Sequence, residues 1–360
     1  MEIMKNKAGR IHSLDLLRGI AVLLMVQQHT GFWFWNEGGA MGSLLHKYPV
    51  MVTINGLGGL AAPLFIILAG AGTALSLNSG RSGRQIFRRG LVLILFGYIL
   101  NILTPAWFSP RSWYVLHLIG FGICVSPLLH KKNSFILFTA AAAIVVISVF
   151  LLYHFKMPRY FSNEFMRGEP GFAGFMKLAL FTGHFPLFPW ITLYMAGIIS
   201  GRWISEGAYG RILKCAALVF SSAVLLYLVK QGNFAFMNNA FGKRLLIINL
   251  YMYPAYPVQF LTLTAASLLM LCTALYTGGK FKITSSNILV LTGRASLTIF
   301  ILHIVIIRNF MVKSGLWQTF SEPLTVTLQI SIIALILLLV YLWNKKDFRY
   351  GFEWILRRIT

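Results

Sequence analysis

Apolar residues gather in long blocks along the chain, and the polar residues fall between them. Ten such blocks can be marked, at residues 14–35, 56–77, 90–104, 113–129, 134–154, 186–204, 212–229, 256–276, 288–308 and 324–343. Most approach the length of about 20 residues that a helix needs to cross a bilayer. No block keeps the one-by-one alternation of a barrel strand, so all are predicted to be helices. The third block is short and ends at Pro105. We therefore expect it to be broken or re-entrant.

Composition supports a membrane protein. Hydrophobic residues make up 57% of the 360 positions and charged residues only 11%, against roughly 45–50% and 25% in soluble domains. The surface of a soluble enzyme would need more charge than this chain supplies. We predict an all-α polytopic bundle of about ten transmembrane helices, forming a single domain over residues 1–360. The three cysteines show no short paired spacing, so neither a disulfide framework nor a metal site is expected.

Basic residues predict the orientation of the bundle. The chain has 32 Lys and Arg against 9 Asp and Glu, a net charge of +23. If the N-terminus is cytoplasmic, the loops on that side carry 19 basic residues and those on the other side 11. The positive-inside rule then places both termini in the cytoplasm. Membrane anchoring explains these charges, so no nucleic-acid partner is expected. Residues 345–360 mix aromatic and basic side chains, which is typical of an interfacial helix.

The first apolar block contains the most informative polar residues. Asp15, Arg18 and His29 lie in or beside it, and ionisable residues within a membrane are costly enough to suggest function. Eleven residues on a helix make three turns plus about 20°, so Arg18 and His29 share a face about 16 Å apart. Asp15 lies one turn before Arg18 and can pair with it. The structural alternative is an interfacial ion pair and a buried histidine without a chemical role.

Several other residues are weaker candidates. Arg294 precedes a helix in which Ser296 and His303 share a face. His184 precedes Pro186 and Pro189, which prevent a regular helix start, and irregular chain at membrane depth mainly lines cavities. The remaining candidates are His117 and Trp190. Each has a structural alternative, such as a snorkelling arginine or an interface aromatic. The aromatic run at residues 32–35 is interpreted as part of a membrane aromatic belt.

Four stretches carry a family resemblance. They are SLDLLRGIAVLLM followed by His29, APLFIILAGAG, HFPLFPWITLYMAGIISGR, and the pair GRASLTIFILH and YGFEWILRR. In this order they resemble the heparan-α-glucosaminide N-acetyltransferase-like membrane proteins. The spacing from Arg18 to His29 is also similar to that in the more distant acyltransferase-3 family. Within the third stretch, Gly197 and Gly201 provide a small face for close helix packing.

The resemblance implies a transmembrane acyltransferase. Such proteins take an acyl group, here expected to be acetyl, from cytoplasmic acyl-CoA and transfer it to an amino sugar or glycan on the far side. Arg18 and His29 match the acyltransferase-3 pair and are the catalytic candidates, with Asp15 added because it can support Arg18. In lysosomal members the proposed histidine lies in the loop before the second helix. The nearest residue here is His46, whose spacing does not match cleanly. We therefore favour His29 and keep His46 as an alternative.

General chemistry agrees with this assignment. Histidine can accept the acceptor's proton near neutral pH, and arginine binds phosphate through its planar fork. We expect acyl-CoA to contact a first set of residues: Arg18, Arg294, His303 and Trp190. We expect the acceptor to contact a second set: His184, His46 and His117. Covalent and direct transfer stay open at this point, as do N- and O-acylation.

A transporter or flippase for an anionic or glycan-type solute is the main alternative. Many helices with Gly and Pro breaks and interior arginines suit that class. However, Asp15 alone among the acidic residues comes near the mid-membrane, and coupled carriers usually keep a carboxylate there. The expected location is a prokaryotic plasma membrane, with lipids as partners. Whether the chain forms a homodimer stays open.

Overall fold

The computed structural model of the protein describes residues 10–37, 44, 46–232, 234–248, 252–281 and 283–360. Helices make up the regular structure of these ranges, and their only β-type pairing is an isolated bridge between Trp35 and Phe320. The predicted all-α class is confirmed. Three basic residues used to predict the orientation, Lys5, Lys7 and Lys282, lie outside the described residues.

Every predicted apolar block coincides with a helix or a short run of helices. In chain order these are α1 (His12–Phe34), α3 (Pro49–Gly58), α4 (Ala61–Asn78), α5 (Gly83–Leu103), α6 (Val115–Leu129), α7 (Ser134–His154), α9 (Leu187–Ser205), α10 (Tyr209–Gln231), α12 (Pro257–Lys280), α13 (Ile288–Arg294), α14 (Ser296–His303) and α16 (Glu322–Asn344). Short helices connect them: η1 (Phe165–Arg167), α8 (Phe172–Lys177), η2 (Leu178–Thr182), η3 (Ala235–Met237), α11 (Ala240–Leu245), η4 (Ile304–Arg308), α15 (Asn309–Lys313) and α17 (Phe352–Ile359). Within the described ranges, seven helical stretches are long and apolar enough to cross a membrane.

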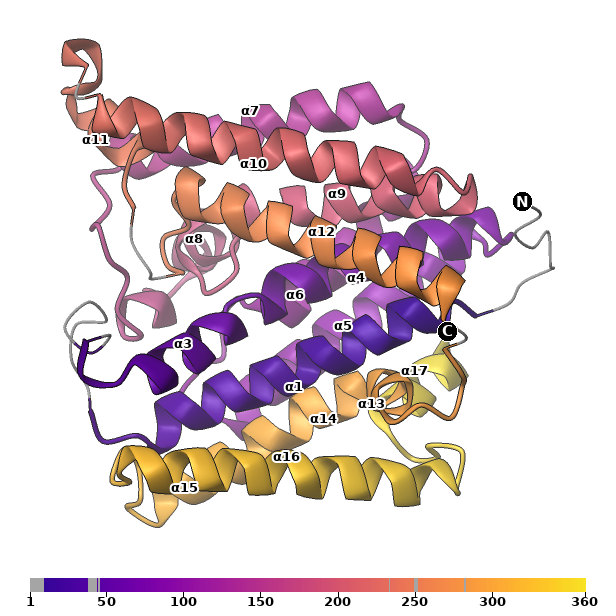
Figure 1. Cartoon of the computed structure of the whole chain (residues 1–360). Helices are drawn as coiled ribbons and strands as arrows, with labels where there is room; N and C mark the ends of the chain where they lie inside the picture. The colour runs from indigo at the N-terminus through magenta and orange to yellow at the C-terminus, as the bar shows by residue number, and fades with distance from the viewer. Residues whose placement is uncertain (1–9, 38–43, 45, 233, 249–251, 282) are drawn as a thin grey trace.

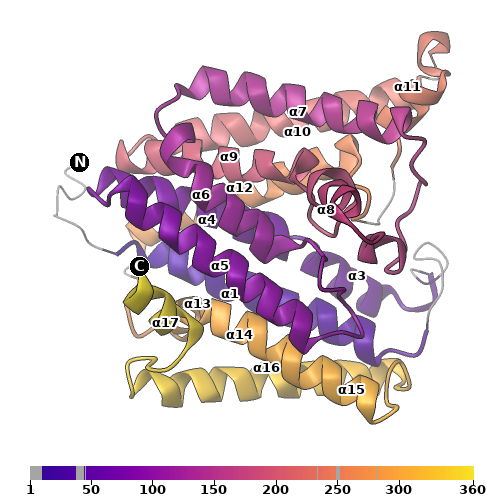
Figure 2. The ribbon, with the colours of Figure 1, turned by 180° about the vertical axis from the view of Figure 1, so that it is seen from behind.

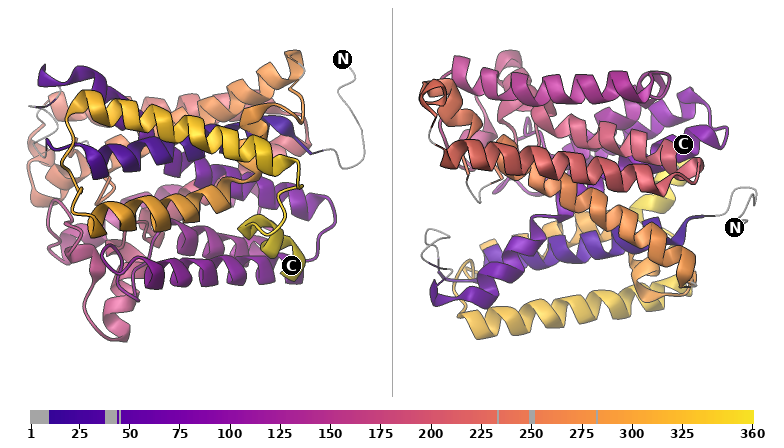
Figure 3. Two further views of the ribbon diagram at one scale, coloured as in Figure 1. Left: turned by 90° about the horizontal axis from the view of Figure 1, so that it is seen from below. Right: turned by 45° about the horizontal axis from the view of Figure 1, so that its top comes forward.

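The long helices form a layered bundle. The α7 and α10 helices lie along one edge, α16 lies along the opposite edge, and α1, α4 and α9 lie between them (Figures 1 and 2). The α12 helix packs against both α10 and α1, so it links the two parts of the bundle (Figure 3). We call the end that carries the start of α1, α13 and α17 the terminal end. The end that carries α8, α11 and α15 is called the loop end (Figure 1).

Glycines allow two helix pairs to approach closely. A Cβ at Gly197 would collide with the backbone of α4, and one at Gly201 would lie 2.6 Å from a backbone oxygen of the same helix. The predicted small face is therefore confirmed. A second pair was not predicted. A Cβ at Gly19 of α1 or at Gly293 of α13 would collide with the backbone of the other helix.

Two predicted elements differ in the structure. The third block is neither broken nor re-entrant, because α5 begins at Gly83 and continues unbroken to Leu103. The backbone N–H of Gln85 donates to the Ser82 hydroxyl, and the backbone N–H of Ser82 donates to the Gln85 side chain. This capping box starts the helix among basic residues that the hydropathy pattern assigned to a loop. The ninth block is interrupted at Ala295, which separates α13 from α14.

The aromatic run at the end of α1 does not form a membrane belt. Phe32 is exposed, but Trp33, Phe34 and Trp35 are all buried within the protein. The belt interpretation is therefore wrong for these three residues. Hydropathy identified them as large amphipathic side chains but did not indicate that neighbouring helices cover them.

Candidate functional site

One large cavity runs through the bundle. Its volume is about 2280 Å³, well above the roughly 300–1,000 Å³ of ordinary small-molecule sites. Its lining includes Arg18 and Arg294 at the terminal end and His29, His184 and Trp107 towards the loop end. Arg18 and His29, which the sequence placed on one helix face, therefore line the same cavity.

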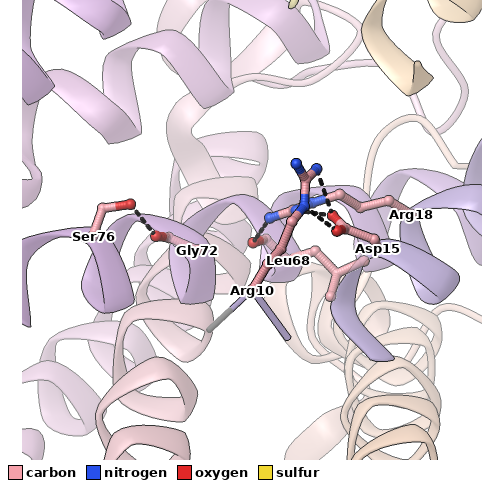
Figure 4. Close-up of polar contacts among 6 residues, drawn as sticks. All are labelled: Arg10, Asp15, Arg18, Leu68, Gly72 and Ser76. Atoms are coloured by element: carbon pink, nitrogen blue, oxygen red, sulfur yellow. Dashed lines mark hydrogen bonds and ion pairs between the residues drawn. The ribbon is translucent and has the colours of Figure 1, made fainter. Parts of the chain in front are cut away.

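The terminal end of the cavity is built around Asp15. This carboxylate is only 1% exposed and accepts a hydrogen bond of 2.9 Å from Arg18 Nη1. Arg10 also donates to it through Nε, and through Nη2 at 3.3 Å (Figure 4). The predicted Asp15–Arg18 pair is confirmed. Because two arginines share one carboxylate, the group keeps a net positive charge.

The guanidinium of Arg18 passes close to α4. Its Nη2 donates to the Leu68 carbonyl at 3.4 Å (Figure 4). A Cβ at Gly72 would lie only 2.7 Å from the same nitrogen. The absence of a side chain at Gly72 therefore leaves room for Arg18 beside α4.

Arginines dominate the charge at this end. Six of them line it among the described residues: Arg10, Arg18, Arg81, Arg89, Arg294 and Arg357. The carboxylates in the described lining are Asp15 and Glu353. Glu353 accepts hydrogen bonds from the backbone N–H of Leu297 and Thr298 at 2.5 and 3.1 Å, so it serves the start of α14. The remaining positive charge suits an anionic ligand.

His29, in the second half of α1, forms a pair with His303 at the end of α14. His29 Nδ1 lies 2.9 Å from His303 Nε2, and His303 Nδ1 lies 2.9 Å from the Ile299 carbonyl oxygen. Since a carbonyl only accepts, Nδ1 of His303 must carry a proton. In the neutral pair, Nε2 of His303 then accepts from Nδ1 of His29. This leaves Nε2 of His29 unprotonated and able to act as a base.

Indole rings surround the histidine pair. Trp33, one turn after His29, stacks on it with ring centroids 5.2 Å apart, and Trp107 meets it edge-on at 5.4 Å. His303 does not itself line the cavity. The sequence analysis expected His303 to contact acyl-CoA, and the structure places its ring against those of His29 and Trp33.

His184 lies beside Trp107, between η2 and α9. It is buried and lines the cavity, and its ring meets those of Trp107 and Phe108 at 6.3 and 5.3 Å. Neither ring nitrogen has a hydrogen-bond partner among the described residues. Burial lowers the pKa of His184 to about 4, so the ring is neutral at physiological pH.

Besides His303, three predicted site residues lie outside the cavity lining. Trp190 is buried between Phe185 and Phe260. His117 is buried at the start of α6, where it accepts a hydrogen bond from the Tyr114 backbone N–H. His46 is exposed. The structure therefore brings Asp15, Arg18, His29, His184 and Arg294 to the cavity, and Trp190, His117 and His46 elsewhere.

Trp107 and Arg308 are among the cavity residues that the sequence analysis did not propose. Trp107 lies in the irregular stretch after α5, and Arg308 ends η4. Arg308 follows His303 by five residues, which an α-helix would separate by about 140°. In the π turn η4, the backbone hydrogen bonds instead join residues i and i+5. The side chains of His303 and Arg308 therefore point in more similar directions than they would on an α-helix. The irregular Trp-Phe pair between Pro105 and Pro110 was the available signal for Trp107.

A comparison with protein families identifies this arrangement. The family model described as heparan-alpha-glucosaminide N-acetyltransferase, catalytic, matches residues 10–232, more than half of the chain. The chain belongs to this family. It is therefore an acetyl-CoA-dependent membrane N-acetyltransferase for a glucosamine-type sugar. The resemblance drawn from the sequence is confirmed, and the family favours an enzyme over a transporter.

The family match covers only part of the candidate site. It includes Asp15, Arg18, His29 and His184 and ends before α12, so His303 and Arg308 come from the rest of the chain. A search of curated proteins found no match. Among the described residues, no group of three or more His, Cys, Asp or Glu is arranged to hold a metal ion.

Proposed function

We propose that the enzyme transfers acetyl from cytoplasmic acetyl-CoA to an amino sugar on the extracytoplasmic side of the membrane. The observation that carries the proposal is the continuity of the cavity. It joins the arginines of the terminal end to His29 within one space. A volume of about 2280 Å³ exceeds that of a usual single-ligand site and leaves room for two substrates.

The terminal end suits the CoA part of the donor. Arginine forks bind phosphate oxygens in pairs, and six arginines line this end. Arg18 lies about 16 Å along α1 from His29. An elongated ligand with phosphates at one end and a thioester at the other matches this distribution. Arg18 and Arg294 are assigned to phosphate binding, with Asp15 holding Arg18 in place.

His29 is assigned the role of general base. The acceptor nitrogen attacks the acetyl carbonyl carbon, and its proton passes to Nε2 of His29. The carbon–sulfur bond then breaks, and the CoA sulfur leaves as a thiolate that takes up a proton. His303 keeps His29 in the required tautomer through the 2.9 Å contact. Neutral histidine bases of this kind contribute roughly 10²–10⁴-fold to a rate.

The two substrates are proposed to enter from opposite sides. The ten apolar blocks would form ten spans of one domain over residues 1–360, with both termini and the helix in residues 345–360 at the cytoplasmic surface. The terminal end would then face the cytoplasm, in agreement with the positive-inside rule. The loop end would face the acceptor. A prokaryotic plasma membrane is the proposed location.

The test compares two histidines. The purified full-length protein is assayed for release of CoA from acetyl-CoA in the presence of glucosamine. We expect His29→Ala to lower kcat by about 100-fold or more. His154→Ala is the matched control, because His154 is exposed at the end of α7 and outside the cavity lining. Undiminished turnover in His29→Ala would remove His29 from the mechanism.

A further inference from the structure

Arg308 is a buried cation that the proposed reaction does not use. Its side chain lies in the cavity wall and is 6% exposed. The guanidinium carbon lies 5.1 Å from the ring centroid of Trp107 and 5.2 Å from that of Trp317. Two indoles therefore flank the guanidinium group. A cation–π pair of this kind is strongest away from water.

Most of the hydrogen-bonding capacity of Arg308 is unused. Nη2 donates to the Ala106 carbonyl at 3.3 Å. Nε and Nη1 are buried and have no partner among the described residues. A buried charge without hydrogen bonds or a counter-ion is costly, so the unused donors indicate a ligand that the protein itself does not supply.

No carboxylate compensates this charge. In the described part of the chain, Arg308 forms no ion pair within 4.0 Å. Arg167, near the same end, donates to the Pro105 carbonyl at 3.0 Å and adds further positive charge. An anionic group would satisfy both the charge and the free N–H groups of Arg308, and the planar fork suits carboxylate, phosphate or sulfate oxygens.

The position of Arg308 indicates which substrate carries this anion. The indole of Trp107 contacts Arg308 and also meets His29 at 5.4 Å, so one ring separates the cation from the base. Arg308 ends η4, directly before α15 at the loop end. Arg18 and Arg294, which are proposed to bind the CoA phosphates, lie near the start of α1 and at the end of α13, both at the terminal end (Figure 1). His184, with two unpartnered nitrogens, meets the same indole. Its neutral ring can hydrogen-bond a hydroxyl group.

We propose that the acceptor is an amino sugar that itself bears an anionic group, and that Arg308 binds this group between Trp107 and Trp317. The inference rests on the proposed function, because it assigns the loop-end part of the cavity to the acceptor. His184 contributes a hydrogen bond to the neutral part of the same sugar. Arg308 thereby sets the preference between charged and uncharged acceptors.

Binding without acetyl-CoA provides the direct test. Calorimetric titration of the purified full-length protein compares glucosamine 6-phosphate, glucosamine 6-sulfate, glucosamine and inorganic phosphate. We expect each anionic sugar to bind at least about tenfold more tightly than glucosamine, as is typical of a charge-assisted pair. Inorganic phosphate should bind more weakly than either. Equal affinity for charged and neutral sugars, or tightest binding of free phosphate, would overturn the proposal.

Matched variants locate the effect. Arg308→Gln should reduce the preference for glucosamine 6-phosphate to about twofold or less, and Arg308→Lys should restore part of it. Arg159→Gln removes the same charge from an exposed position outside the cavity lining and should keep the wild-type preference. A preference that survives Arg308→Gln would contradict the assignment.

The two proposals fail in different ways. If no sugar is acetylated, the proposed reaction is wrong, but the binding preference still reports on Arg308. If acetyl transfer proceeds with the same kcat/KM for charged and neutral sugars, the reaction stands and the anion site is wrong. The wild-type comparison needs no substitution, so misfolding of a variant leaves this conclusion intact.

Discussion

At the scale of single residues, the chemistry depends on which nitrogen of His29 carries a proton. The Ile299 carbonyl fixes the proton on Nδ1 of His303, and His303 in turn fixes the proton on Nδ1 of His29. The proposed base is thus oriented by a backbone group through an intermediate imidazole. Orientation by neutral groups differs from orientation by a carboxylate, because no carboxylate among the described residues forms an ion pair with either ring to stabilise the imidazolium form.

The first prediction concerns His303 as a positioning residue. His303→Ala removes the acceptor for Nδ1–H of His29, and we expect kcat to fall by about 10–100-fold. His303→Gln can still accept through its amide oxygen and should recover at least half of this loss on a logarithmic scale. The measurement is kcat at saturating acetyl-CoA across pH 6–9. Equal activity of the two variants would show that the hydrogen bond accepted from His29 does not contribute to the rate.

Residue patterns predicted part of the site. Asp15, Arg18 and His29 were identified because their spacing on one helix is set by local geometry, which the sequence contains. Trp33 was assigned to the membrane interface, because nothing in a single helix shows that the His303 ring stacks on it 5.8 Å away. Arg308 was missed since its direction depends on a π turn. Contacts between distant segments could not be inferred from spacing.

At the scale of elements, α17 secures the start of α14. Glu353 accepts from two backbone N–H groups of α14 and, at 2.6 Å, from the Thr298 hydroxyl. These amides would otherwise lack partners and carry partial positive charge. The α14 helix ends at His303, so α17 fixes the start of the element that carries one partner of the proposed catalytic pair. The helix itself was predicted, but its docking onto α14 was not.

The second prediction follows from the burial of Glu353. Burial raises the pKa of this carboxyl above its ordinary value despite the hydrogen bonds it accepts. A folded-state pKa above the unfolded value contributes stability at low pH that is lost as pH rises through the folded pKa. The side chain introduced by Glu353→Gln does not titrate. The Tm of this variant, measured relative to that of wild type, should therefore rise as the pH is increased from 4.5 to 7.5. A Tm difference that stays constant over this range would contradict the prediction.

Some helix boundaries could be predicted from the sequence and others could not. The ten blocks located the helices because mean hydropathy over a helix length is a strong signal. The start of α5 was missed, since a capping box places helix among basic residues. The break at Ala295 was missed because α13 is held against α1 by Gly19 and Gly293. This contact needs both helices together, and the sequence of neither helix alone shows it.

At the scale of the whole molecule, the arginines that line the cavity are divided between the two ends of the bundle. The terminal end of the cavity collects six arginines, and the loop-end side has one buried arginine between indoles. The cavity connects these regions past His29. The proposed donor and acceptor therefore meet at one base without sharing an entrance. This arrangement predicts that the two ends of the bundle face opposite sides of the membrane.

The last prediction tests this orientation. Ser285 is exposed at the terminal end between α12 and α13, and Thr319 is exposed at the loop end between α15 and α16. In intact cells, a membrane-impermeant maleimide should label Thr319→Cys, whereas Ser285→Cys should react only after permeabilisation. Wild type controls for Cys124, Cys215 and Cys272, which are buried or half-buried. Labelling of Ser285→Cys in intact cells would reverse the orientation. Acetyl-CoA would then have to enter at the loop end. Of the seven arginines that line the cavity among the described residues, Arg308 alone belongs to that side.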